Sequence, residues 1–510
     1  MTVGVVLSTS TIPGAGTSQR VAGSGYIVAG LTQRGNPTQP VKVRSMQQYV
    51  QLFGAEVTFG FLYNDLAQFF GEGGDYAWVC RTVGTAPVAG TVTLNDTAVT
   101  PLPTLKLTAG CPSIDPISGS NTGNVPDPGS WSATLTVQIV ASVLAGNFDV
   151  VVAQSGAQVE RWGPFPTVAA AVSKINSSSA YLWATNMFST SAGTVANPAV
   201  VGPVALSAGT SDRTTVTAAM VAAALNLVPS SIAAGLWAAT PGYDASLTGT
   251  ALIAYGAASN CDVGLSPTEG MNEATVETAA ANFRGVTGSQ NAGYFWPWVL
   301  IPDGAGGTLV VPPDGFVAGV RSRTILQTGG VWQPPAGNFG VAQYVVGLDP
   351  ASGVVTDAIG DSLNDEHVNV IRPKNGVRLY GWTSLSTDEV NYPLLQQSDI
   401  LNNISAALDT IEQQFAFQMI DSLGQLGSGM RNAAKQVLQP YITAGALWPG
   451  PPASNGQPSD PGYLLDTGSD VNTPASIAAN SYGIAVYVRP AGAAQTLPVK
   501  VVKVAIGNAF

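Results

Sequence analysis

Apolar runs alternate with amphipathic stretches along the first 90 residues. An apolar run at 21–31, VAGSGYIVAGL, predicts a buried strand, and YAWVCRTV at 76–83 predicts another. Between them, apolar residues at three- and four-residue spacing predict a helix at 45–53, ended by Gly54, and a second helix at 62–70. The predicted order is therefore strand, helix, helix, strand.

From residue 213 onward, predicted helices and strands alternate. The helices are expected at 216–227, 245–257 and 272–284, and the strands at 235–240, 261–266 and 294–301. Such alternation is typical of a parallel sheet covered by helices. Further on we expect a helix starting near Pro312, strands at 368–372 and 377–383, and a long helix at 394–423 whose buried stripe is Leu401, Ile404, Leu408, Ile411, Phe415 and Met419.

The stretch between residues 91 and 212 has a different amino-acid composition. Thr, Val, Ser, Pro and Gly dominate it, and alternating apolar and polar positions, as at 134–140, predict strands. One short helix is expected at 168–175. We interpret 91–212 as a β-rich domain inserted into an α/β core that is built from residues 21–90 and 213–480.

Both ends of the chain carry extended apolar segments, an N-terminal arm at 1–20 and strands with an arm at 481–510. Their apolar positions are Val3, Val5 and Leu7 at the start, and Val499, Val501, Val502, Val504 and Ile506 at the end. A terminal strand either completes a sheet of its own chain or adds to a neighbour's sheet edge, and both alternatives stay open from the residues alone. The expected fold class is α+β and multidomain, with extended terminal strands.

The charge balance narrows the possible functions. Charged residues make up 10% of the 510 residues, and 20 Lys and Arg face 31 Asp and Glu, which gives a net charge of −11. This acidity opposes binding to phosphate backbones, so we expect no direct nucleic-acid partner. A surface with so few charges tends to associate, and a large assembly hides part of it in subunit contacts. A lone secreted β-rich protein has a similar composition.

We predict no membrane insertion. The longest uncharged stretch, 214–243, contains Asn226 and Pro229 and is interpreted as helix, turn and strand. The first residues, MTVGVVLSTSTIPG, lack the basic start and long apolar core of a secretory signal, so export by the general route is not expected.

Candidate catalytic and metal-binding groups are sparse. Cys80, Cys111 and Cys261 are odd in number and form no CxxC pair, so buried free thiols are favoured over a disulfide or zinc site. His367 is the single histidine, and any Ser-His-Asp or multi-histidine site would need it; a loop or strand-edge role is favoured.

Two further patterns are better explained by ordinary structure than by ligand binding. Asp357, Asp361, Asp365 and Glu366 have helical spacing but lack the glycine and ligand positions of an EF-hand, which favours a solvated helix face. The glycine-rich segment 304–307 lacks the Lys of a phosphate-binding loop and is predicted as a hairpin turn. We therefore predict no catalytic residue, no cofactor and no metal.

Three blocks are specific enough to compare with known families. The first is GYIVAGLTQRGNPTQPVKVRSMQQYVQLFG at 25–54. The second and most specific is YFWPWVLIPD at 294–303 with VVPPDGFVAGVRSRT and VWQPPAG after it, and the third is VNVIRPKNGVRLYGWTSLS at 368–386. In this order they resemble the tail sheath proteins of contractile phages, type VI secretion systems and pyocin-like particles. The first twenty residues match that family poorly, and 91–212 falls where sheath proteins carry variable insertions.

The resemblance implies a structural subunit of a virion tail, not an enzyme. Sheath subunits assemble in the host bacterial cytoplasm, polymerise into a helical tube around an inner tail tube, and contract to drive that tube through the host envelope. The implied partners are further copies of the chain, the inner tail tube protein, and baseplate and tail terminator proteins. The terminal strands would link neighbouring subunits. The alternative is a static capsid, baseplate or β-rich surface protein.

Arg431 and Lys435, four residues apart after the long helix, are candidate contacts to the inner tube. An exposed, solvated face is the favoured interpretation of the pair.

Overall fold

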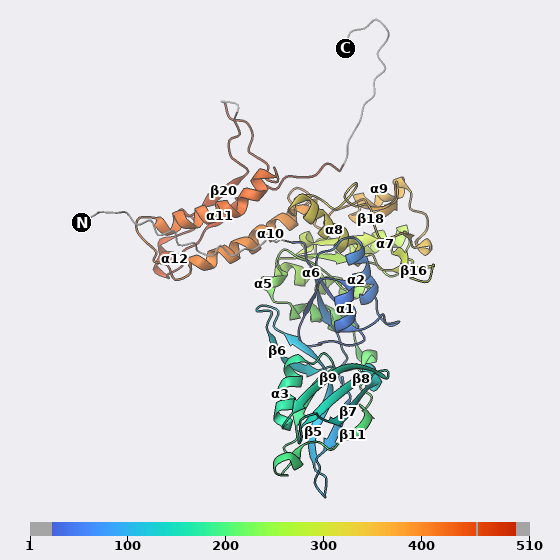
Figure 1. Cartoon of the computed structure of the whole chain (residues 1–510). Helices are drawn as coiled ribbons and strands as arrows, with labels where there is room; N and C mark the ends of the chain where they lie inside the picture. The colour runs from blue at the N-terminus through green and yellow to red at the C-terminus, as the bar shows by residue number, and fades with distance from the viewer. Residues whose placement is uncertain (1–22, 455–456, 496–510) are drawn as a thin grey trace, which may run out of the picture.

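An eight-stranded sheet forms the centre of the computed structural model, which describes residues 23–454 and 457–495 (Figure 1). Its strand order is β19-β18-β14-β13-β12-β1-β3-β2. The start of the chain supplies β1 (Tyr26–Gly30), β2 (Val41–Val43) and β3 (Ala77–Arg81), and the later part supplies β12 (Trp237–Ala239), β13 (Asp262–Leu265), β14 (Ala292–Trp296), β18 (Val368–Pro373) and β19 (Val377–Leu379). Pairing is parallel from β3 to β18, and only β2 and β19 join this sheet antiparallel. The predicted α/β core, built from two separate parts of the chain, is confirmed.

Two apolar layers sandwich this sheet, because successive strand residues point to opposite faces. In β1, Ile27 and Ala29 join one buried cluster and Tyr26 and Val28 join the other. The first cluster includes residues of α4 (Ala218–Ala224), α5 (Ser230–Ala233), α6 (Ala245–Ser259), α7 (Glu273–Ala281) and α9 (Asp357–Asp365), and the second includes residues of α1 (Met46–Phe53), α2 (Leu62–Gly71) and α8 (Asp314–Thr328). Because both faces of the sheet are buried, the sequences of its strands are apolar at nearly every position.

Helix α8 lies unusually close to α2. A Cβ added at Gly315 would lie 2.0 Å from the backbone oxygen of Asp65, and one at Gly319 would lie 2.7 Å from the Cβ of Glu72. The two glycines of the GFVAG segment therefore allow the helices to touch through their backbones. The Glu72 carboxylate accepts hydrogen bonds from the backbone amides of residues 343–345 and pairs with Arg323 at 2.8 Å.

The segment predicted as one strand at 294–301 is two strands. β14 ends at Trp296, and β15 (Val299–Pro302) leaves the large sheet to pair with β16 (Thr308–Val311) and β17 (Gly347–Leu348). Pro297 lacks the amide that would continue a ladder, which accounts for the break. β15 and β16 form a hairpin around residues 304–307, as predicted for that glycine-rich turn.

The insertion is a separate β-rich body below the core in Figure 1. One of its sheets joins β4 (Thr91–Asn95), β5 (Pro103–Ile114), β6 (Asn121–Pro126) and β10 (Leu182–Asn186), and the other joins β7 (Leu135–Ala141), β8 (Phe148–Gln154), β9 (Ala157–Phe165) and β11 (Val201–Ala205). The predicted short helix is α3 (Val168–Ser178). The insertion has its own apolar core, and its exact limits, 91–212, remain our proposal.

A buried ion pair joins the insertion to the core. Arg81, at the end of β3, pairs with Asp127 of the insertion at 2.6 Å, and both side chains are almost fully buried. Asp127 also accepts from the backbone amide of Gly35 at 2.8 Å, and Arg81 donates to the carbonyl oxygens of Gly35 and Pro128.

We predict that Arg81→Met destabilises the chain by roughly 3–5 kcal/mol, because it leaves the Asp127 carboxylate buried without its cation. Urea unfolding measures the change. Arg161→Met is the matched control: Arg161 pairs with Asp149 inside the insertion, but its side chain is 51% exposed, so its loss should cost less than about 1 kcal/mol. Equal losses of stability from the two substitutions would contradict the role given to the buried Arg81–Asp127 pair.

Candidate functional site

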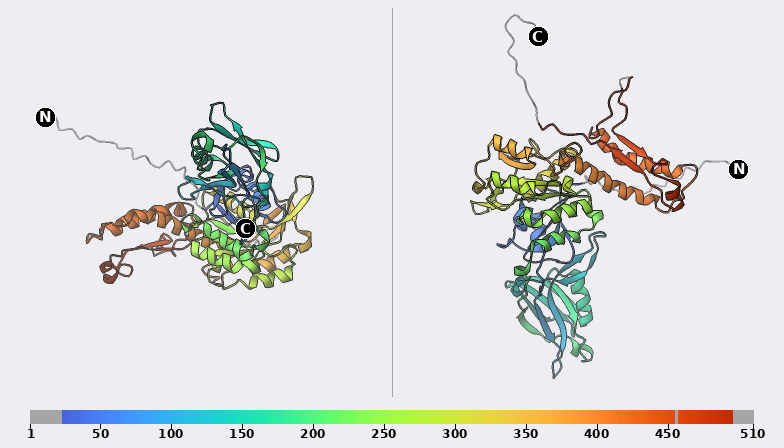
Figure 2. Two further views of the ribbon diagram at one scale, coloured as in Figure 1. Left: turned by 90° about the horizontal axis from the view of Figure 1, so that it is seen from below. Right: turned by 180° about the vertical axis from the view of Figure 1, so that it is seen from behind.

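Two long helices, one short helix and a small sheet project from the core as an arm, residues 395–454 and 457–490 (Figures 1 and 2). The arm contains α10 (Leu395–Glu412), α11 (Gln425–Thr443), β20 (Tyr463–Asp466), α12 (Pro474–Ala478) and β21 (Ala485–Val488). All fully buried residues of α10 lie between 395 and 404. The second half of α10 therefore extends beyond the core, and α11 packs back along it.

The long helix predicted at 394–423 is wrong in its second part. α10 ends at Glu412, and Met419, which the helical pattern placed on a buried stripe, is 79% exposed. Of that stripe only Ile404 is fully buried; Leu401, Leu408, Ile411 and Phe415 are half-buried. The Asp421 carboxylate accepts hydrogen bonds from the amides of Leu423, Gln425 and Leu426 at 2.8–2.9 Å. This side-chain capping starts α11 and competes with continuation of α10.

A buried guanidinium ties the root of the arm to the core. Arg321 of α8 forms a bidentate ion pair with Asp399 of α10. It also donates to the carbonyl oxygen of Gly23 at 2.6 Å and to that of Gly235 at 3.3 Å. Gly23 precedes β1 and Gly235 precedes β12, so a single side chain holds the base of α10 against the beginnings of two core strands.

A second buried carboxylate adjoins this pair. Asp262 accepts hydrogen bonds from Ser398 Oγ and Asn402 Nδ2, both at 2.9 Å and both on α10. Burial, and then the neighbouring Asp399, raise the pKa of the Asp262 carboxyl well above its usual range, against the opposing effect of Arg321.

The raised pKa of the Asp262 carboxyl determines whether stability rises or falls with pH. The folded chain holds this proton more tightly than the unfolded chain does, so stability falls as the pH rises from about 4 upward. We expect Asp262→Asn to weaken that fall, by about 1.4 kcal/mol for each pKa unit removed. Thermal unfolding at pH 5 and pH 8 compares the two chains. Asp365→Asn, at an exposed position, is the control; an unchanged pH response in Asp262→Asn would contradict the prediction.

The small sheet of the arm has one buried and one exposed face. Antiparallel β20 and β21 place Tyr463 opposite Val488 and Leu464 opposite Tyr487. Tyr463 and Val488 pack on the cluster around α10 and α11, whereas Leu464 and Tyr487 are 59% and 57% exposed. Within residues 23–454 and 457–495, no third strand pairs with β20 or β21 themselves, although the Trp448 amide donates to the Arg489 oxygen just past β21. A two-stranded sheet with open edges is marginal by itself and is suited to receive a further strand.

The predicted basic pair lies on α11, and both side chains are exposed. Arg431 donates to Thr467 Oγ1, just after β20, and to Ser428 Oγ at 3.2 Å. Lys435, one turn further, makes no hydrogen bond or ion pair with any described residue. Contact of this pair with an inner tube stays a prediction.

The predicted terminal strand positions lie outside the described residues. These are Val3, Val5, Leu7, Val499, Val501, Val502, Val504 and Ile506. Whether they exchange between subunits is therefore also still a prediction.

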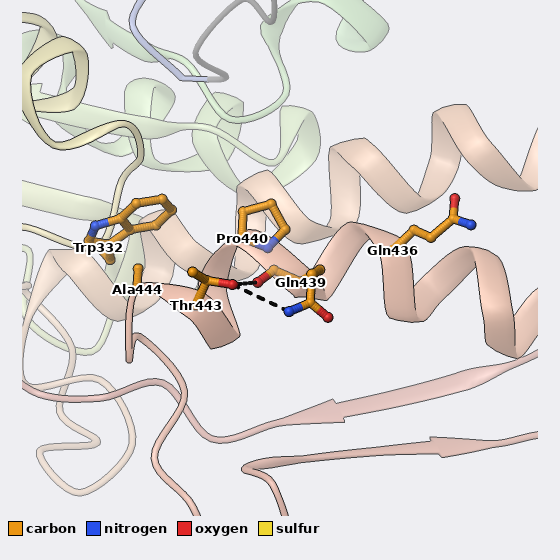
Figure 3. A pocket seen from close by; sticks show the side chains of 6 residues that line it. All are labelled: Trp332, Gln436, Gln439, Pro440, Thr443 and Ala444. Atoms are coloured by element: carbon orange, nitrogen blue, oxygen red, sulfur yellow. Dashed lines mark hydrogen bonds between the residues drawn. The ribbon is translucent and has the colours of Figure 1, made fainter.

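An open cavity of about 590 Å³ lies between α11 and the loop after α8 (Figure 3). Trp332 forms one wall, and Gln436, Gln439, Pro440, Thr443 and Ala444 of α11 form the other. The side-chain amide of Gln439 donates to Thr443 Oγ1 at 3.3 Å. No charged side chain lines this cavity, so it offers a contact surface rather than a set of acid, base or nucleophile.

The groups considered for chemistry are buried. Cys80, Cys111 and Cys261 are buried and free, as predicted, and burial raises the pKa of each thiol. His367 precedes β18; its Nδ1 contacts the Ser384 backbone oxygen and its Nε2 lies 3.1 Å from Arg284.

The acidic residues of α9 form ion pairs on one helix face. Asp357 pairs with Arg372 and Lys374, and Asp361 pairs with Arg372 at 3.0 Å. In the described part of the chain, no three His, Cys, Asp or Glu residues are grouped to hold a metal ion. No helix there is long and apolar enough to cross a membrane.

The architecture is the fold of contractile sheath proteins. The sheath tail protein from Listeria innocua matches with a TM-score of 0.56 at 13% identity, covering 88% of this chain and 89% of that chain. A chain of the contracted helical sheath of the anti-feeding prophage matches at 0.53 and 15%, covering 95% and 93%. A chain of the contracted baseplate of the same particle matches at 0.55 and 14%, covering 98% of each chain. The resemblance predicted from the three sequence blocks is confirmed at the level of the fold.

No family model matches the sequence, and no curated protein matches it. At 13–15% identity the structural likeness carries the fold and not the function.

Proposed function

We propose that the chain is the structural subunit of a contractile tail sheath, with no catalytic role. The sheath fold spans nearly the whole chain. The observation that carries the proposal is the projecting arm, whose two-stranded sheet pairs with no third strand among the described residues. An isolated monomer gains nothing from such an arm, whereas a polymer needs one.

In this proposal the small sheet receives strands from neighbouring copies. The terminal segments carry alternating apolar residues and enter and leave the described structure at Gly23 and Gln495. A strand added to β20 or β21 would form ladder hydrogen bonds and place its side chains beside Leu464 and Tyr487 on the exposed face. Links of this kind hold subunits together while their bodies turn.

Repetition of one head-to-tail contact with a rotation that does not close generates a tube. Contraction then requires two packings of the same subunit, the extended one kinetically trapped and the contracted one lower in free energy. No nucleotide is needed. Further copies of the chain, an inner tail tube and baseplate and terminator proteins are the proposed partners, in a virion tail assembled in the host bacterial cytoplasm. Arg431 and Lys435 remain the proposed contacts to the inner tube.

A static baseplate component is the second candidate, because two of the similar structures are of baseplates. Negative-stain electron microscopy of the purified protein separates the two. Hollow tubes with a repeated ring structure support the sheath, and closed particles or monomers at high concentration support the baseplate.

We predict that deleting residues 497–510 yields a folded monomer that forms no tubes, because the exchanged strand is lost. Circular dichroism checks the fold and electron microscopy checks assembly. Tubes that persist after the deletion would rule out strand exchange through this end.

A matched pair of full-length variants isolates the backbone ladder. Val501→Pro with Val504→Pro removes two amide donors from the segment. Val501→Thr with Val504→Thr keeps those donors and the β propensity. Tubes are expected from the Thr pair and not from the Pro pair.

A further inference from the structure

The arm meets the core through a polar stripe of α10. Four side chains share one face of this helix at three- and four-residue spacing, and all are buried: Ser398, Asp399, Asn402 and Asn403. A helix normally turns an apolar stripe toward the interior. The neighbouring side of α10 follows that rule, because Ile400 and Ile404 join one apolar cluster with Ile325 of α8. The root of the arm therefore has a polar side and an apolar side.

The polar side can separate from the core at a low cost in free energy. Its side chains contact Arg321, Asp262 and the backbone oxygen of Gly235, to which Asn403 donates at 3.2 Å. Water can replace each of these hydrogen bonds, so each contributes little net free energy, and a buried ion pair is weak evidence for stability. Separation of the apolar side would instead expose apolar surface to water. The apolar side is therefore the more stable attachment.

The charges of the polar side do not balance. Two buried carboxyls, those of Asp262 and Asp399, adjoin the single guanidinium of Arg321. The other titratable groups that face them among the described residues are Cys261 and Tyr441. Burial raises the pKa of both, so they stay neutral between pH 5 and pH 9. When both carboxyls are ionised, one negative charge is buried without a partner, which is unfavourable.

The hydrogen bonds favour one position for a proton that restores the balance. Asp262 Oδ1 accepts from Ser398 and Asn402, whereas Oδ2 is buried and has no hydrogen-bond partner among the described residues. A proton on Oδ2 would make this atom a donor to the neighbouring Asp399 carboxylate. Asp399 keeps its charge, because both of its oxygens accept from Arg321. The closed interface therefore holds one proton, on Asp262.

We propose that the polar stripe of α10 is a latch, which opens when Asp262 loses its proton and lets the arm swing about its apolar side. The arm moves as one unit, because α10, α11 and the small sheet share an apolar cluster. Two positions of the arm would supply the two packings that contraction requires, and this role alone rests on the proposed function. The latch itself depends only on contacts within one chain.

Distances between spin labels test the latch in the full-length chain. We would place one label at Thr410→Cys in the exposed part of α10 and the other at Ala274→Cys on α7, since the native cysteines are buried. The closed latch holds its proton more tightly than the open one, so the population with a changed distance should rise on the order of tenfold from pH 5 to pH 9. Labels at Ala274→Cys and Gln51→Cys, both on the core, are the control. A changed distance in the control pair as well would overturn the latch.

Two isosteric substitutions should shift the latch in opposite directions. Asp262→Asn keeps the acceptor for Ser398 and Asn402 and offers Asp399 a permanent donor, so the arm should stay closed at both pH values. Asp399→Asn removes the carboxylate that pairs with Arg321, so the arm should open at both. Each substitution removes one acid from the same cluster, and an effect of net charge alone would shift both variants equally. Equal shifts would overturn the proposal.

A third variant covers the case in which Asp399→Asn unfolds the chain, which circular dichroism would show. Asn402→Ala removes one hydrogen bond of the latch and no charge, so it should open the arm in the same direction as Asp399→Asn. An arm that stays as closed as in the native chain would overturn the latch.

The outcomes separate the latch from the proposed function, because the label distances report on the arm whether or not tubes form. Opening of the arm in a chain that forms no tubes supports the latch and contradicts the sheath. Tubes from a chain whose label distances do not change with pH or with these substitutions overturn the latch and leave the sheath in place.

Discussion

The Arg321 guanidinium is the interaction on which the arrangement of this molecule depends. It reaches from the middle of α8 to Asp399 on α10 and to the carbonyl oxygens of Gly23 and Gly235. All these groups are buried, and a guanidinium removed from water is stable only when each donor meets an acceptor in good geometry. The root of the arm is therefore held to the segments that precede β1 and β12, by a group that tolerates little displacement.

The chain has few charged residues, and several of its arginines are buried. Charged residues are 10% of the sequence, yet Arg81, Arg321, Arg323 and Arg372 are all nearly fully buried. Three of them, Arg81, Arg321 and Arg323, join segments that are far apart in sequence, such as α8 to Glu72 or β3 to the insertion. Few charges are left for the surface, which would favour the self-association proposed above.

The sequence predicted the core well because its signal is physically strong there. Strands buried on both faces must be apolar throughout, and α1 and α2 are amphipathic helices followed by tight glycine positions. The arm was harder to predict. The end of α10 has no glycine or proline to mark it, since Phe417 takes the left-handed conformation that glycine usually occupies. Strand β20 is only four residues long and follows a proline- and glycine-rich stretch, so no alternation could be recognised. Arg321 and Arg323 gave one signal that could have been used, two cations that follow the apolar FVAGV segment.

The attachment of the insertion has a consequence for how such chains diversify. The strand that leaves the core and the one that returns lie side by side: the amide of Gly84 donates to the Ser211 oxygen at 2.8 Å, and Val88 and Thr210 form a bridge. The core already holds the two attachment points of the insertion next to each other. The entropy cost of closing the chain between them would therefore depend only weakly on the length of a replacement domain. This junction is a natural graft point, at which a domain of another size or surface chemistry can replace the insertion if it supplies an anion for Arg81, while the Arg321–Asp399 pair at the root of the arm is left untouched.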